Sequence, residues 1–324
     1  PFFAGAPNAS TPASQVDAFG FVADVRNAGA ANQSGATLTL TIENLDEEVV
    51  FSSELTYGAI ASDSTAENVF FPDEFTPPAV ANEIYFGTYS LAIAGGVEDE
   101  VPGNNTQEFA FEVPDSTFSK ELGIGLGAWI NVNNFSWGNI FYVPNGDGYY
   151  ANTMSFAIAN AANLAGRSVT TLLYKWDGDL NNNGSVDPAE YGNQPISFNI
   201  YEITGMETGN NALITIPVNI DGDQIALEDD SYYIATIQYT TEDNVRMNPL
   251  GTDIFDYTAT WFYSDSLGRP RYASAFDSGN DGTYSLVFFV VPVIRLNIST
   301  ITSSAPEALL PSDAVTVFPN PADA

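Results

Sequence analysis

The segment DGDLNNNGSVDPAE, residues 177–190, carries oxygen-bearing side chains at alternate positions and a glycine among them. Calcium binds six to eight oxygen ligands at about 2.3–2.6 Å, and a tight loop with alternating inward side chains can supply them from one short stretch. The residues that would offer these oxygens are Asp179, Asn181, Asn183, Ser185, Asp187 and Glu190. The segment therefore predicts a calcium site.

Counted from Asp179, the segment resembles the twelve-residue calcium loop of EF-hand and dockerin domains. That loop has side-chain oxygens at positions one, three, five and nine, a glycine at six for the sharp turn, a backbone carbonyl ligand at seven and a bidentate glutamate at twelve. Gly184 stands at six, Ser185 at seven and the aliphatic Val186 at eight. The resemblance implies bound Ca²⁺, with Glu190 as the bidentate ligand.

The flanks of the loop differ from those of an EF-hand, which has a helix on each side. VTTLLYKW (169–176) reads as a strand, and Pro188 lies inside the end of the loop. The loop occurs once, which argues against dockerin-type binding to a cohesin. We therefore expect a structural calcium ion that braces a long connection, with a switch or a ligand-bridging site as the alternative.

Other acidic segments are weaker candidates for a cation site. Asp221-Gly222-Asp223 and residues 277–282 (DSGNDG) could each hold a cation, but both also suit hairpin turns. Glu98-Asp99-Glu100 and Asp229-Asp230 are expected to be solvated.

The charge balance excludes several classes of partner and chemistry. The chain has 41 acidic and 8 basic residues, a net charge of −33, and neither His nor Cys. Nucleic acids and anionic membranes are unsuitable partners because phosphate binding needs basic patches. Thiol catalysis, disulfides, Ser-His-Asp triads and ordinary zinc sites are excluded, whereas oxygen-ligated cations are not. The longest apolar run, residues 285–294, is too short for a transmembrane helix.

Two further functions need no His or Cys. Glycoside hydrolysis requires only a pair of carboxylates, but no particular pair stands out. A carbohydrate-binding platform could be made of Trp129, Trp137, Trp176 and Trp261 with Tyr149-Tyr150, although aromatic residues in sandwiches are more often part of the core.

The elements that must position these residues read as strands. In residues 15–115, ATLTLTIE (36–43), TYSLAIA (88–94) and EFAFEV (108–113) alternate apolar and polar residues between clusters of turn formers. About seven such runs in about 100 residues predict an immunoglobulin-like sandwich after an N-terminal segment, 1–14.

This first region resembles the CARDB-like (cell-adhesion-related) bacterial sandwich domain. The resemblance depends on Asn27 and Gly29 after the first core strand, and on Pro102, Asn104 and Asn105 before the last. In such domains these residues shape turns, so the resemblance implies a fold and no activity.

After a linker at 116–121, residues 122–299 contain about ten strand-like runs. They predict a larger, jelly-roll-like sandwich that carries the calcium loop. Residues 159–167 (ANAANLAGR) are expected to form a short helical turn. The overall expectation is an all-β chain of two tandem sandwich domains.

The C-terminal end follows a Ser/Thr/Pro-rich linker, 300–314. Residues 315–324 (VTVFPNPADA) resemble the start of the type A sorting domain of Bacteroidota proteins exported by the type IX secretion system. The resemblance implies passage through the periplasm and an extracellular or outer-surface location. Any signal peptide is expected to lie upstream of Pro1 or to have been removed.

These observations predict a non-enzymatic, secreted or surface-displayed, calcium-stabilised protein that acts in adhesion or as a subunit of an extracellular assembly. Its partners would be calcium and a cell-surface glycan or protein, or further copies of itself. A carbohydrate-binding module of a larger secreted protein is the alternative, and a glycoside hydrolase is a weaker one.

Overall fold

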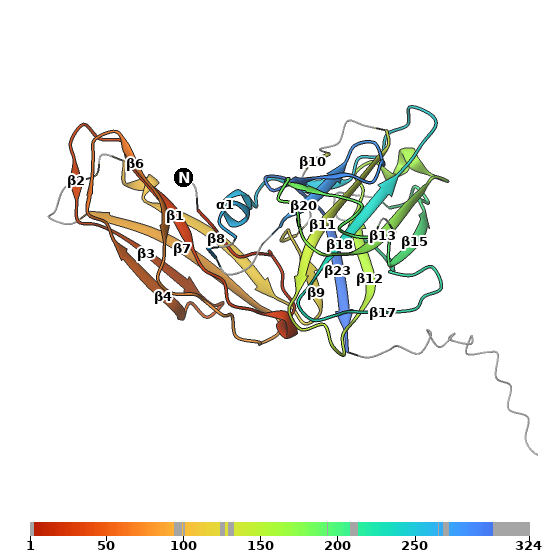
Figure 1. Cartoon of the computed structure of the whole chain (residues 1–324), viewed down its shortest axis with the longest axis horizontal. Coiled ribbons are helices and arrows are strands. Elements are labelled where there is room, and N and C mark those ends of the chain that lie inside the picture. Colours follow the sequence, from red (N-terminus) through yellow and green to blue (C-terminus); the bar gives the residue numbers. More distant parts are fainter. Residues whose placement is uncertain are drawn as a thin grey trace, which may run out of the picture.

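The computed structural model describes residues 3–93, 99, 101–123, 127–128, 133–192, 194–207, 213–264, 266–267 and 272–300. Figure 1 shows two lobes side by side, each built almost entirely of strands. Every strand pair is antiparallel in the described part of the chain. The expected all-β class with β-sandwich domains is confirmed.

The first lobe packs a four-stranded sheet, in the order β4-β3-β7-β8, against the pair β1-β6, with β2-β5 as a small third sheet. Its strands are β1 (Val22–Asn27), β2 (Gln33–Ser34), β3 (Ala36–Glu43), β4 (Val49–Thr56), β5 (Ala59–Ile60), β6 (Ser64–Phe70), β7 (Glu83–Ile93) and β8 (Thr106–Val113). Leu38, Leu40 and Ile42 of β3 are buried and alternate with half-exposed threonines, as the period-two pattern predicts. Aromatic side chains such as Phe21 and Tyr85 fill much of this core.

Two turns of this lobe are formed by residues that the sequence singled out. The Asn27 side chain donates hydrogen bonds to the carbonyls of Ala31, Ile60 and Ala61, and its Oδ1 accepts one from the Gly29 amide at 3.0 Å. Pro102 begins a 3-10 turn, η3 (Pro102–Asn104), just before β8. These residues shape turns, as expected.

The second lobe packs a seven-stranded sheet, in the order β14-β21-β20-β11-β18-β13-β15, against a five-stranded sheet that contains β16-β12-β23-β9 and β17. Its strands are β9 (Thr117–Ser119), β10 (Gly127–Ala128), β11 (Phe135–Val143), β12 (Tyr150–Ala157), β13 (Ser168–Trp176), β14 (Ser185–Val186), β15 (Ser197–Glu202), β16 (Leu213–Pro217), β17 (Ile225–Ala226), β18 (Ser231–Tyr239), β19 (Leu250–Thr252), β20 (Ser274–Asp277), β21 (Tyr284–Val287), β22 (Val291–Pro292) and β23 (Ile294–Ser299). Strands β10, β19 and β22 form a separate small sheet.

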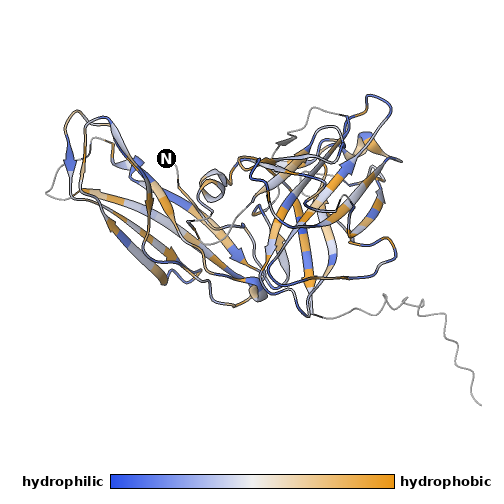
Figure 2. Cartoon of the chain, viewed as in Figure 1, coloured by the Kyte–Doolittle hydropathy of each residue, from blue (hydrophilic) through white to orange (hydrophobic). Residues whose placement is uncertain are grey.

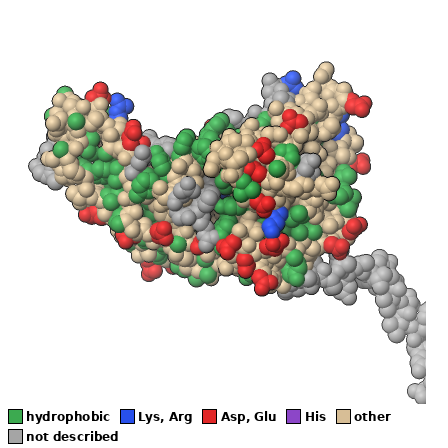
Figure 3. Space-filling view, viewed as in Figure 1, with side chains coloured by type: hydrophobic (Ala, Val, Ile, Leu, Met, Phe, Trp, Pro, Cys, Tyr) green, Lys and Arg blue, Asp and Glu red, His purple; other side chains and the backbone are tan. Residues whose placement is uncertain are grey.

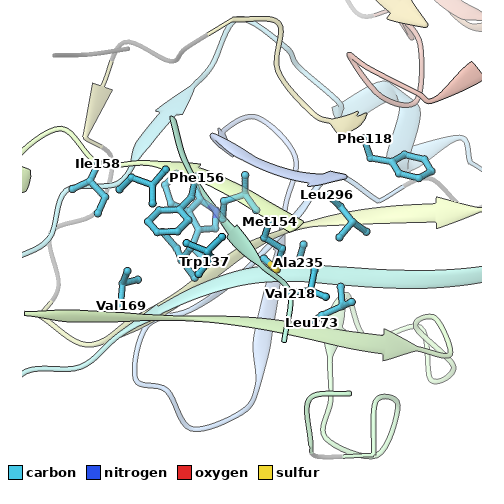
Figure 4. Packing of buried hydrophobic residues seen from close by; sticks show 14 of the residues in the cluster. Phe118, Trp137, Met154, Phe156, Ile158, Val169, Leu173, Val218, Ala235 and Leu296 are labelled. Atoms are coloured by element: carbon cyan, nitrogen blue, oxygen red, sulfur yellow. The ribbon is translucent and has the colours of Figure 1, made fainter. Parts of the chain in front are cut away.

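The core of the second lobe lies between its two large sheets (Figure 4). Trp137 and Leu173 come from the seven-stranded sheet, and Phe156 and Leu296 come from the five-stranded sheet. The strands of this lobe carry long hydrophobic stretches (Figure 2) because the central ones are buried on both faces. Part of their second face is covered by the loop described below.

Helical structure in the described residues is short. It comprises η1 (Ala13–Gln15), η3, η4 (Ala161–Leu164) and α1 (Thr258–Phe262). The turn expected within 159–167 is confirmed as η4, whereas nothing in the sequence predicted α1. No helix of the described residues is long and apolar enough to cross a membrane.

The N-terminal segment connects the two lobes. Ser10 exchanges two backbone hydrogen bonds of 3.0 Å with Ser119 of β9, and the Gln15 side chain bonds the backbone of Asn145 in both directions. Residues 116–121, expected to be a linker, contain β9 because this strand completes the five-stranded sheet beside β23. Apart from Thr300, the linker 300–314 and the sorting-like segment 315–324 lie outside the described residues.

Candidate metal centre

The loop that follows β13 folds back over the outer face of the seven-stranded sheet. Its neck is closed by a 2.9 Å hydrogen bond from the Asp177 amide to the Glu190 carbonyl. Val186, in the two-residue strand β14, pairs with Tyr284 of β21 and is completely buried. The loop is therefore part of the fold and covers part of the second face of the sheet.

Tyr191 fixes the end of the loop to that face. Its ring packs against Tyr174 of β13 with a centroid separation of 4.9 Å, and its hydroxyl donates a 2.5 Å hydrogen bond to the Gly282 carbonyl. Burial, with smaller contributions from Tyr284 and nearby acids, raises the pKa of Tyr191 to about 12. The hydroxyl thus remains protonated and able to donate at neutral pH.

The middle of the loop turns sharply where the sequence predicted a turn. Gly184 has a φ of +73° and Asn182 a φ of +54°, both in the left-handed region. The Asp179 carboxylate accepts hydrogen bonds from the amides of Asn183 at 3.0 Å and Gly184 at 2.9 Å. The first predicted ligand therefore points into the turn.

Three predicted ligands meet directly. The side-chain amides of Asn181 and Asn183 both donate to Oδ2 of Asp187, at 2.9 and 2.8 Å. Their Oδ1 atoms accept backbone hydrogen bonds from Asn183 and Ser185. A half-turn of each amide about its Cβ–Cγ bond would exchange nitrogen and oxygen, so that two oxygens would face the Asp187 carboxylate.

The Glu190 carboxylate is buried and is held by hydrogen bonds from three N–H groups. Its side chain is only 3% exposed, and its carboxylate accepts hydrogen bonds from Leu180 N at 2.9 Å, Asp187 N at 3.0 Å and Trp176 Nε1 at 3.2 Å. Within the described residues, no three acidic side chains lie close enough together to hold one metal ion. The structure thus brings Asn181, Asn183 and Asp187 together, and it links Asp179 and Glu190 to them through backbone amides. The ladder pairing of Ser185 with Ser285 fixes the backbone at the seventh position.

The oxygen donors of this loop fit calcium chemically. The set contains three carboxylates, two amides and a backbone carbonyl, all hard oxygen ligands. The turn already brings Asn183 into contact with the carboxylates of Asp179 and Asp187. For all of these residues to bind one calcium ion, the side-chain amides of Asn181 and Asn183 would have to turn. The Glu190 carboxylate would have to give up its N–H partners and bind the ion instead.

The other acidic segments form turns. Asp277 accepts amide hydrogen bonds from Gly279 and Gly282 within the β20–β21 hairpin, and Asp221 follows an Asn219 side-chain turn. Asp229, expected to be only solvated, accepts two amide hydrogen bonds from Gly146 and Asp147. Residues 98 and 100 lie outside the described part.

The predicted aromatic platform does not form as one surface. Trp137 and Trp176 are buried, and Trp129 lies outside the described residues. Trp261 instead stacks on Phe288, with ring centroids 4.6 Å apart, beside Phe262 and Phe289, which are 61% and 59% exposed. The adjacent pairs WF (261–262) and FF (288–289) are the sequence signal for this cluster, because the side chains of neighbouring residues point in different directions and cannot all face the core.

Glu121 is a buried acid with a structural role. Burial raises the pKa of its carboxyl group, while hydrogen bonds from Arg295 at 2.8 and 3.1 Å and from Ser119 oppose the rise. This ion pair joins β23 to the end of β9 and lines no described pocket.

Comparison with known proteins assigns no family. No family model matches the sequence, and no curated protein matches it. Among solved structures, the chain is similar to the clostridial cysteine protease Cwp84 after propeptide cleavage, with a TM-score of 0.33 and 12% identity over 89% of this chain and 72% of that chain. A likeness this weak assigns neither a family nor an activity to the chain.

Proposed function

We propose that this chain is a calcium-stabilised, non-enzymatic protein of the extracellular or outer cell surface that serves in adhesion or as a subunit of an extracellular assembly. The observation that carries the proposal is the loop at 177–190, in which Asn181, Asn183 and Asp187 meet while the loop covers part of one face of the main sheet. A brace at this position would stabilise the fold of the second lobe.

The residues that would hold the ion are Asp179, Asn181, Asn183, Ser185, Asp187 and Glu190. A bound calcium ion supplies two positive charges that offset the repulsion among three carboxylates. Asp179 and Asp187 would retain their inward orientation, and Glu190 would connect the ion to the neck of the loop. With two amides in place of acids, we expect a dissociation constant of about 10⁻⁴–10⁻³ M, the range of extracellular calcium modules.

The surface location is supported by two features. The end of the chain resembles a type IX sorting segment, and the net charge of −33 leaves acidic side chains over both lobes (Figure 3). A surface of this kind keeps a protein soluble where calcium is abundant.

Thermal unfolding in calcium and in chelator tests the brace. At a calcium concentration 100 times the dissociation constant, binding to the folded state alone should add about 2.7 kcal/mol to the free energy of unfolding. The melting temperature should therefore be higher in calcium than in EGTA, and magnesium at the same concentration should not replace calcium. Equal melting temperatures in calcium and EGTA would contradict the proposal that calcium stabilises the fold.

Adhesion or assembly is tested by sedimentation and by retention on bacterial envelopes in calcium. We expect self-association, or retention on envelopes of the producing cells. A protein that stays monomeric and binds no envelope would contradict this part of the proposal.

Carbohydrate binding is a second candidate because Trp261, Phe262, Phe288 and Phe289 form a partly exposed aromatic cluster. Aromatic faces stack on sugar rings, so a glycan array should show binding that the Trp261→Ala variant loses. An array without bound glycans would eliminate this candidate.

A further inference from the structure

Strand β8 forms one edge of the four-stranded sheet, and only part of this edge is paired. The Glu112 amide donates to the Ala9 carbonyl at 2.8 Å, and the Glu112 carbonyl accepts from the Thr11 amide at 3.1 Å. Because outward backbone groups recur at every second residue, those of Ala110 and Glu108 also face outward. None of the residues that the structure describes forms a hydrogen bond with them. The edge is thus open for one or two further residue pairs.

This open edge lines a groove of about 470 Å³ between the lobes. Residues 5–9 flank the edge, and residues 254–260, which include the start of α1, form the opposite wall. The Phe109 ring lies over Gly87, where an added Cβ would come within 2.1 Å of it. The groove therefore has a closely packed floor at the edge of β8.

The groove offers apolar contact as well as backbone groups. Phe86 is 45% exposed, and Phe109 and Phe255 also line the groove. Thr260 is buried in its wall, and its hydroxyl has no hydrogen-bond partner among the described residues. Ile254, which is 71% exposed, also lines the groove, and Phe255 packs against the same small buried cluster as Phe288. Hydrophobic side chains gather in the hollow between the lobes in Figure 3.

The charges around the groove indicate which kind of partner would bind there. Glu108 and Asp256 are exposed at its rim, and its described lining contains neither Lys nor Arg. A second copy of the chain carries a net charge of −33, and residues 301–324 contain Glu307, Asp313 and Asp323 but no basic residue. Electrostatic complementarity therefore disfavours the chain itself as the occupant and favours a basic one.

We propose that this groove binds an extended, Lys- or Arg-bearing peptide segment of another protein, which adds a strand to the open edge of β8. The main chain of the segment would pair with Ala110 and Glu108, as in other cases of strand addition. Alternate apolar side chains would contact Phe109 and Phe255, and the basic side chains would face Glu108 and Asp256. The proposal does not depend on calcium binding.

The test uses a fluorescein-labelled nine-residue peptide of alternating lysine and valine, with binding to the full chain followed by anisotropy. The double variant Glu108→Gln, Asp256→Asn should weaken binding about fivefold, since each exposed charge contact contributes modestly. The matched variant Asp221→Asn, Asp223→Asn removes the same charge from an exposed turn outside the groove and should leave the affinity unchanged. Equal effects of the two double variants would mean non-specific attraction to an acidic protein and would overturn the proposal.

Two further measurements distinguish strand addition from a contact that is only electrostatic. A peptide of the same charge with proline at alternate valines cannot form a regular strand, because each proline ring fixes φ and removes an N–H group, and it should lose most of its binding. Amide exchange of Ala110 should slow when the alternating peptide is bound. Full binding of the proline peptide, or slowed exchange confined to Trp261 and Phe262, would contradict strand addition.

Discussion

At the scale of single residues, the Glu190 carboxylate is the group on which the loop depends most. It is buried and accepts hydrogen bonds from Trp176, Leu180 and Asp187, so it holds the start, the middle and the end of the loop together. Sequence spacing singled out Glu190 as a calcium ligand. Its bond to the Trp176 indole could not be predicted, because it depends on the side of the sheet on which the loop folds.

Replacing Glu190 by alanine should therefore destabilise the protein even in chelator. Three N–H donors lose their acceptor, and each unmet buried donor costs about 1–3 kcal/mol. We expect a loss of about 3 kcal/mol in the free energy of unfolding, measured with urea in EGTA. Glu228→Ala, which removes a partly exposed ion pair with Lys175, should cost less than about 1 kcal/mol. Equal losses for the two variants would show that Glu190 does not anchor the loop.

Glu121 should give the protein a pH dependence of defined sign. Its pKa is raised in the folded state, so the folded chain binds this proton more tightly than the unfolded chain does. The contribution of Glu121 to stability is therefore largest below its unfolded pKa and is lost as the pH rises through the folded value. The stability of the wild type relative to Glu121→Gln should increase as the pH falls from 7 to about 4.5. A decrease over that interval would mean that the Arg295 ion pair outweighs burial.

At the scale of elements, local pattern predicts strands well only where one face is buried. In β3 the alternation of buried and half-exposed residues matches the sequence. In β11, FSWGNIFYV, nearly every residue is buried, so the sequence shows a strand but not which face meets the core. The two-residue strand β14 has no local signal because its partner, β21, lies about 100 residues later in the chain.

Close packing on the floor of the groove gives a prediction for β7. Gly87→Ala should destabilise the first lobe by about 2 kcal/mol because the new Cβ would overlap the Phe109 ring. Gly58→Ala is the matched control, since a Cβ there has no neighbour within 4 Å. Denaturant unfolding of both variants measures the difference, and a stable Gly87→Ala protein would show that Phe109 is free to move away.

At the scale of the whole molecule, the lobes are joined by buried polar contacts that no local pattern revealed. Lys120 is 2% exposed and donates hydrogen bonds to the carbonyls of Pro7 at 2.9 Å and Tyr272 at 2.6 Å. Its ammonium group also lies 5.2 Å from the centre of the Tyr257 ring. The sequence placed Lys120 in the linker 116–121, so its burial between Pro7 and Tyr272 was not predicted.

Lys120→Met should loosen this junction. Two carbonyls lose a charged donor, so we expect a loss of about 2–4 kcal/mol in the free energy of unfolding and faster amide exchange at Ser10 and Ser119. Lys175→Met, at a partly exposed ion pair, should cost less than about 1 kcal/mol and leave those amides unchanged. Unchanged exchange at Ser10 and Ser119 in Lys120→Met would show that Lys120 does not hold the lobes together.

The central claim, a calcium ion held by residues 179–190, is tested most directly by calorimetric titration of the chelator-treated full chain with calcium. We predict one ion per chain in the wild type and loss of most of this binding in Asp187→Asn, because Asp187 is the anion that Asn181 and Asn183 face. Asp221→Asn, with the same loss of charge in another turn, should bind as the wild type does. Absence of calcium binding in the wild type, or equal binding by Asp187→Asn, would contradict the account.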